Sequence, residues 1–126
     1  METSFTLGVI ALFSILVGIS IVLFWMNLYA KRALFDPNSS RSVIETKYHL
    51  VAELVAAAIL IMGGTGISLA TSWGVGVAFA GLGMLLYANI NGVGFYARKN
   101  DKRMVWVFYV TIIVSIAALV LLLSTL

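Results

Sequence analysis

Four long apolar runs dominate this sequence and limit what it can fold into. They cover about residues 5–29, 48–69, 75–95 and 104–123. A helix rises about 1.5 Å per residue, so each run is long enough to cross a hydrocarbon core of about 30 Å. With 62% hydrophobic and 10% charged residues, the chain has too little polar surface for a water-soluble domain. The sequence therefore predicts an all-α integral membrane protein, a four-helix antiparallel bundle with residues 1–126 as its single domain.

Composition also excludes several classes of function. The chain has no cysteine, which excludes a disulfide framework, iron–sulfur ligation and a cysteine nucleophile. A net charge of +3 does not indicate nucleic-acid binding, because the cations flank the apolar runs instead of forming one basic face. The first run lacks a basic segment before it and is too long for a secretory signal, so we expect a retained span. The expected environment is a lipid bilayer, with no nucleic-acid partner.

The positive charges indicate how the chain is oriented. All eight Lys and Arg residues lie in or beside two loops, in segments 31–47 and 96–103. The other side of the membrane would hold the two termini and a short turn near Ser72, none of which carries a cation. The positive-inside rule predicts that both basic loops are cytoplasmic and both termini extracytoplasmic, with the cell (plasma) membrane as the expected location. Trp25 and Tyr29, just before the first loop, are typical of aromatic anchors at an interface.

Local signals mark the start of the second helix. The segment 36–40, Asp-Pro-Asn-Ser-Ser, favours a turn in the first basic loop. Ser42 and Glu45 then have the spacing of a capping box, in which the serine caps the helix and the glutamate reaches back. We expect this helix to begin outside the hydrocarbon and to enter it near His49.

Small residues gather at two places within the predicted spans. Three glycines occur within residues 63–66, which predicts a close helix approach or a local break in the second span. In the third span, Gly76, Ala80 and Gly83 recur at the spacing i, i+4, i+7, with Gly81 nearby. This spacing predicts a face on which another helix packs.

Glu53 is the one acidic residue that does not fall in a loop or at an end of the chain or of a helix. It lies six residues beyond Lys47, about 9 Å deeper along a helix. A charged carboxylate at the centre of a span costs about 2.5–3.5 kcal/mol, so we expect Glu53 to be protonated, paired or within reach of the headgroups. His49, the only histidine, precedes it by four residues on the same face. Glu53 is either an interhelical hydrogen-bonding acid or a proton or cation site, and His49 either an interfacial histidine or a relay.

Amide and phenol side chains from other spans reach a similar depth. Asn89 and Asn91 lie nine and seven residues before Arg98, and Asn27 lies four residues before Lys31, so it is shallower. Interhelical hydrogen bonds in lipid average under about 1 kcal/mol, so such a layer fixes helix register more than it stabilises the fold. The candidate proton- or ligand-binding residues are therefore Glu53, His49, Asn89, Asn91, Asn27 and Tyr87.

Templates for enzymes and for bound metals or cofactors do not fit. His49 and Glu53 supply two ligands per chain, whereas a zinc site needs three or four. One histidine is a poor basis for a haem site, and the glycines of residues 63–66 lack the Lys-Ser/Thr pair of a phosphate-binding loop. No Ser-His-Asp arrangement is indicated. We expect no enzyme activity, no metal and no cofactor.

Two functions remain open. The first is a proton- or cation-linked transporter or channel that uses the intramembrane carboxylate of Glu53. So small a chain can hardly surround a permeation path alone, so this function predicts a homo-oligomer, most simply a two-fold dimer. The second is an accessory or structural subunit of a larger membrane complex, which the short loops and glycine-lined faces favour.

Overall fold

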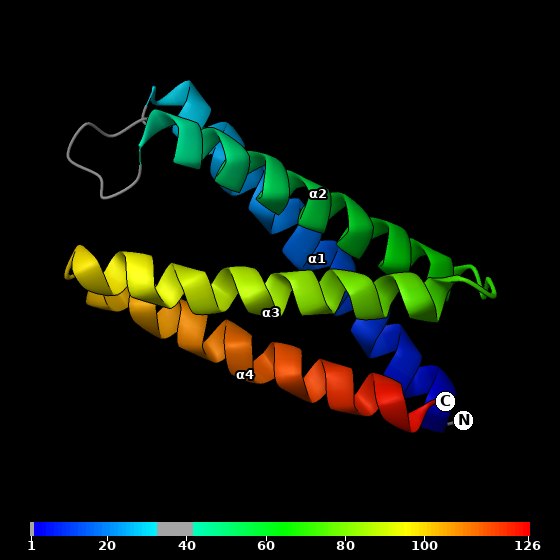
Figure 1. Ribbon diagram of the computed structural model, residues 1–126. Coiled ribbons are helices and arrows are strands. Elements are labelled where there is room, and N and C mark those ends of the chain that lie inside the picture. The colour runs from blue at the N-terminus through cyan, green and yellow to red at the C-terminus, as the bar shows by residue number, and fades with distance from the viewer. Residues whose placement is uncertain (1, 33–41) are drawn as a thin grey trace.

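The computed structural model describes residues 2–32 and 42–126, and this part of the chain forms four helices (Figure 1). They are α1 (Glu2–Ala30), α2 (Val43–Ser68), α3 (Gly74–Arg98) and α4 (Lys102–Ser124). Each is long and apolar enough to cross a membrane, which confirms the prediction of an all-helical chain with four such segments. The turn predicted at residues 36–40 lies outside the described residues.

Helices that follow one another in the sequence are also neighbours in space. The main interfaces join α1 to α2, α2 to α3 and α3 to α4, whereas α1 meets α3 and α4 only over short stretches. Both termini lie at the end of the molecule that holds the turn between α2 and α3, and the turn between α3 and α4 lies at the opposite end (Figure 1). The core is a narrow row of apolar side chains: Ile10, Leu60, Ala78, Leu82, Leu85, Ala118 and Leu122.

Side-chain caps define where α2 and α4 begin. The hydroxyl of Ser42 accepts a hydrogen bond from the backbone amide of Glu45 at 3.1 Å, which confirms the serine half of the predicted capping box. At α4, a carboxylate oxygen of Asp101 accepts a bond from the amide of Met104 at 3.2 Å. Asp101 therefore acts as a helix cap within the short basic turn between α3 and α4.

Glycines bring α2 and α3 into backbone contact near the turn that joins them. A Cβ added at Gly63 would lie 2.6 Å from the Cα of Ala78, and one added at Gly66 would lie 2.8 Å from the Cα of Gly74. No larger residue fits at either position without separating the two helices. The predicted close approach at residues 63–66 is confirmed, and α2 continues through these glycines without a break.

The small-residue face of α3 that packs on α2 is not the one that the spacing indicated. Gly76, Ala80 and Gly83 are exposed, and a Cβ added at either glycine meets nothing within 4 Å in the described structure. The face against α2 has the same spacing but begins two residues earlier: Gly74, Ala78 and Gly81. Small residues occur on both sides of α3, so the glycines of α2 decide which side faces inward.

The helix pairs separate away from these contacts. Figure 1 shows α2 and α3 close together near their shared turn and well apart at the end that holds the α3–α4 turn, so the α1–α2 pair diverges from the α3–α4 pair. Gly81, next to Leu60, is the last of the tight glycine contacts along this interface. The candidate site residues of α2 and α3 lie beyond that point, where the helices no longer touch closely.

Candidate functional site

A cavity of about 940 Å³ lies between the diverging helix pairs and is bordered by residues of all four helices. Most of its wall is apolar, and aromatic rings from α1, α3 and α4 contribute to it. These rings belong to Phe24, Trp25, Phe95, Tyr96 and Phe108. The volume is in the range of about 300–1,000 Å³ that is usual for small-molecule sites. Polar side chains from all four helices also line it, and they include the predicted site residues Glu53, His49 and Asn89.

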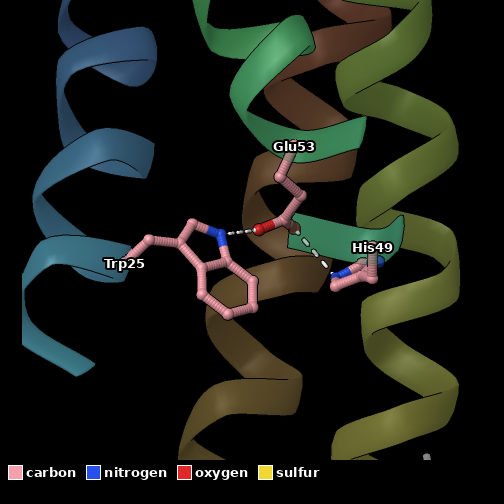
Figure 2. A network of polar contacts seen from close by, with 3 residues as sticks. All are labelled: Trp25, His49 and Glu53. Carbon is pink, nitrogen blue, oxygen red and sulfur yellow. Dashed lines mark hydrogen bonds and ion pairs between the residues drawn. The ribbon is translucent and has the colours of Figure 1, made fainter. Parts of the chain in front are cut away.

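Glu53 reaches from α2 to the buried indole of Trp25 on α1. The indole Nε1–H of Trp25 donates a hydrogen bond to Oε2 of Glu53 (Figure 2). Trp25 is only 7% exposed, and the indole nitrogen can act only as a donor. The bond therefore holds one oxygen of the carboxylate at the α1–α2 interface, while Glu53 also borders the cavity.

His49 lies beside the second carboxylate oxygen. Its Nε2 is 3.4 Å from Oε1 of Glu53, one helical turn away on α2, as the i, i+4 spacing predicted. The imidazole also meets the Trp25 ring edge-on, with centroids 5.9 Å apart. Each oxygen of Glu53 thus has its own nitrogen neighbour. An ionised carboxylate can accept from both nitrogens at once, whereas a carboxylic acid must use one oxygen as a donor.

Asn89 of α3 borders the same cavity and is almost completely buried, at 4% exposed. Its Nδ2 has no hydrogen-bond partner within residues 2–32 and 42–126. Buried amide donors are nearly always satisfied in folded proteins, so this one needs an explanation. Asn89 borders the cavity as a residue, but its Nδ2 is itself inaccessible, so the side-chain amide has to rotate before an acceptor in the cavity can reach it.

The other predicted site residues are divided between different surfaces. Tyr87 and Asn91 border a smaller cavity of about 320 Å³, together with Glu53 and His49. Both are exposed on α3, and 73% of Tyr87 is accessible. Asn27 is exposed on α1 and does not line either of these two cavities in the described structure. The structure thus places Asn89 in the larger cavity with the Glu53–His49 pair, and Asn91 on a different face of α3.

Trp25 is the site residue that sequence reasoning missed, because its place before a basic loop is typical of an interfacial anchor. A count from the cationic ends could have found it. Trp25 lies six residues before Lys31, and Glu53 lies six residues after Lys47, so the two are at equal depth on helices joined by one loop. A buried indole needs an acceptor, and Glu53 is the acid at that depth.

Charged side chains also border the larger cavity, at the basic end of the molecule. Arg32 follows α1, Lys99 follows α3 and Asp101 precedes α4. The Nζ of Lys99 lies 4.7 Å from the centre of the Phe95 ring, in a cation–π contact. Among the described residues, no group of three His, Cys, Asp or Glu side chains is placed to hold a metal ion.

A comparison with protein families finds a match that covers nearly the whole chain. The family described as Domain of unknown function (DUF8058) matches residues 6–126. The chain belongs to this family. The DUF8058 match includes Trp25, His49, Glu53 and Asn89, so the whole candidate site lies within the domain. No curated protein and no solved structure matches the chain.

Proposed function

We propose that this DUF8058 protein is a small transporter or channel that works as an oligomer, with Glu53 as its proton- or cation-binding carboxylate. One observation carries the proposal: the side chain of Glu53, 15% exposed, is held by Trp25 while it borders a cavity of about 940 Å³. Ionisable residues in membrane spans are costly, and they face cavities or the bundle interior where they serve ion or substrate pathways. In the proposed membrane arrangement, Glu53 would have such a position.

The proposed orientation places the cavity's charged rim towards the cytoplasm. In this arrangement the helices form an antiparallel bundle in the cell membrane, segments 31–47 and 96–103 are cytoplasmic, and both termini are extracytoplasmic. The support is that every Lys and Arg of the sequence lies in these two segments. Glu53 would then exchange its proton or cation with the cytoplasmic side first.

His49 is the proposed relay between Glu53 and the rim, since its Nε2 is 3.4 Å from the carboxylate and its ring also borders the cavity. Charged and titratable groups of the other helices act on the same site. Those that border either cavity are Arg32 after α1, Tyr87, Tyr96 and Lys99 on or after α3, and Asp101 before α4. In the proposed orientation, the hydrocarbon core would separate these charged and titratable groups from the termini and the α2–α3 turn.

The exposed face of α3 supports the oligomeric part of the proposal. Gly76 and Gly83 leave open space on that face, and small residues let helices approach closely in lipid. A two-fold dimer is the simplest assembly of identical chains that would cover it. The same face supports a second candidate function, an accessory or structural subunit of a larger membrane complex, in which a different chain would pack there. A stable homo-oligomer purified without other proteins would contradict this second function.

Proton binding at Glu53 can be followed through Trp25. In a Trp73→Phe/Trp106→Phe background, Trp25 is the remaining tryptophan, and its emission reports on the acceptor of its indole N–H. His49 also lies against the Trp25 ring, so His49→Gln is added to this background. We expect the emission to change with pH as Glu53 takes up a proton, and Glu53→Gln to remove this change because an amide does not titrate. Glu45→Gln is the matched control, since Glu45 is on the same helix but exposed at its first turn.

Flux measurements test the transport step itself. We expect protein in liposomes to pass protons or a cation under an imposed gradient, and Glu53→Gln to lower this rate by about ten-fold or more. The Glu45→Gln protein should behave as the unmodified chain does. Equal rates in the Glu53→Gln and unmodified proteins would contradict the proposal.

A further inference from the structure

We infer that the larger cavity takes a lipophilic organic cation that also carries a hydrogen-bond acceptor, with Glu53 opposite the positive charge and Asn89 opposite the acceptor. This inference rests on the proposed function, because it names the class of substrate for the Glu53 site. Four features of the cavity lead to it: its size, its single deep carboxylate, its aromatic wall and the unpartnered amide of Asn89.

Size and ligand chemistry argue against a bare metal ion. A cavity of about 940 Å³ is far larger than an ion needs and suits a molecule of drug size. Hard divalent cations require six or more oxygen ligands, or near-octahedral geometry. Among the described residues that line this cavity, Glu53 is a carboxylate on a helix and Asp101 is a carboxylate at the rim, already engaged as the cap of α4. The wall thus offers much apolar surface and two carboxylates, and its Ser20, Thr46 and Thr111 hydroxyls donate to carbonyls one helical turn back in the chain.

The charge of the expected ligand follows from the wall. The face of an aromatic ring attracts cations, and the attraction strengthens where water is excluded. Aromatic rings from three helices line the cavity, and the contact between Lys99 and Phe95 shows that this wall already holds one cation. Farther from the basic end of the cavity, Glu53 would attract a positive group and repel a negative one. Arg32 and Lys99 lie at the rim, outside the deep part where Glu53 meets Trp25.

Asn89 adds a second polar contact to this ligand. Asn89 borders the cavity, and its Nδ2 is buried without a hydrogen-bond partner among the described residues. The last torsion of an asparagine side chain is soft, so a rotation of the amide can turn Nδ2 towards the cavity. A ligand with an ester, ether or carbonyl oxygen would satisfy it. One hydrogen bond favours a ligand with the acceptor by about five-fold, so a cation without the acceptor still binds, but more weakly. The preferred ligand therefore has a flat or bulky apolar body, one positive charge and at least one acceptor oxygen.

Two ions of equal size and opposite charge test the sign of the charge. Tetraphenylphosphonium and tetraphenylborate share their shape, so they differ at the cavity mainly in charge. We expect saturable binding of tetraphenylphosphonium to the protein in nanodiscs, above the level of protein-free nanodiscs, and a loss of about ten-fold in Glu53→Gln. Tetraphenylborate should show no saturable binding, and Glu45→Gln should leave phosphonium binding unchanged. Equal affinity for both ions, or phosphonium binding that is insensitive to Glu53→Gln, would overturn the inference.

A second cation tests Asn89. Rhodamine 6G carries acceptor oxygens that tetraphenylphosphonium lacks, so Asn89→Leu should weaken rhodamine 6G binding about five-fold and leave phosphonium binding unchanged. Asn89→Ala, which adds no bulk, should show the same pattern. Equal effects on both ligands, or no effect on either, would remove Asn89 from the site.

The pH response of Trp25 separates this inference from the function on which it rests. If rhodamine 6G and tetraphenylphosphonium both fail to bind while Trp25 emission still reports proton uptake that Glu53→Gln removes, the substrate class is wrong and the proton site stands. If the protein shows neither binding nor a Glu53-dependent pH response, both proposals are wrong.

Discussion

The indole N–H of Trp25 on α1 is hydrogen-bonded to the carboxylate of Glu53 on α2, 28 residues away in the sequence. The bond lies within the part of the α1–α2 pair that borders the larger cavity, and His49 stands on the other side of the same carboxylate (Figure 2). One side chain therefore contributes both to the packing of two helices and to the wall of the candidate site. Substitutions that separate these two roles are the most informative.

Replacing Trp25 by phenylalanine removes the hydrogen bond and keeps an aromatic ring at the interface. We expect the Trp25→Phe protein to lose about 1 kcal/mol of stability, the size of a good hydrogen bond between helices in lipid. Unfolding in mixed micelles by increasing denaturing detergent would measure it. Trp106→Phe is the control, because Trp106 is 69% exposed and should tolerate the change. Equal losses in the two variants would show that the Trp25 bond contributes nothing specific.

The glycine contacts between α2 and α3 predict a contrast between two equally small changes. A Cβ at Gly63 would lie 2.6 Å from the backbone of Ala78, so Gly63→Ala should force the helices apart and cost about 1–3 kcal/mol. Gly76→Ala should be neutral or slightly stabilising, since its Cβ meets nothing within 4 Å and alanine favours a helix. Thermal unfolding of both variants would measure the difference. A Gly63→Ala protein as stable as the Gly76→Ala protein would contradict the close approach.

We expect Asn89→Leu to stabilise the protein while it weakens the binding of a ligand that carries an acceptor. The buried Nδ2 of Asn89 is unpaired within the described structure, so Asn89→Leu, which removes the donor at nearly constant volume, should raise stability by about 1 kcal/mol. The melting temperature without added ligand would show this. A lower melting temperature would mean that the Asn89 amide already has a hydrogen-bond partner when no ligand has been added.

The exposed face of α3, formed by Gly76, Ala80 and Gly83, predicts that two copies of the chain can be cross-linked there. The sequence has no cysteine, so each introduced thiol is unique. We expect Gly83→Cys to form disulfide-linked dimers in the membrane under mild oxidation, because the small-residue face would lie at the two-fold axis. Ile113→Cys, at a 67% exposed position of α4, should remain monomeric on a denaturing gel. Dimers at Ile113 but not at Gly83 would place the interface on another helix.

Some features of the site follow from neighbours within one helix. The i, i+4 spacing predicted the Glu53–His49 contact, and the Ser42 cap of Glu45 was readable from their three-residue separation. The four apolar runs likewise predicted four helices of spanning length. Each of these depends on helix geometry alone, which repeats in every helix.

Relations between helices were not readable in the same way. The spacing of small residues on α3 fits two faces equally, and the glycines of α2 pack on the one that begins at Gly74. Counted from the cationic end of the third span, Asn89 and Asn91 lie at similar depths. They nevertheless border different cavities, because residues two apart on a helix point to different sides. The hydrogen-bond partner of Glu53 is Trp25. Their equal distance from the cationic ends makes this contact possible, but it does not show which way the two side chains point.

The sequence by itself determined that this chain is apolar, helical and one-sided in its positive charge, since hydropathy, helix periodicity and loop composition are properties of short segments. Only the tertiary structure decided which side of each helix faces inward, that α2 and α3 part beyond Gly81, and that a cavity forms there beside Glu53. The reason is that helix rotation and crossing depend on many weak contacts summed along whole interfaces, where the loss of one Cβ at a glycine can outweigh a regular pattern.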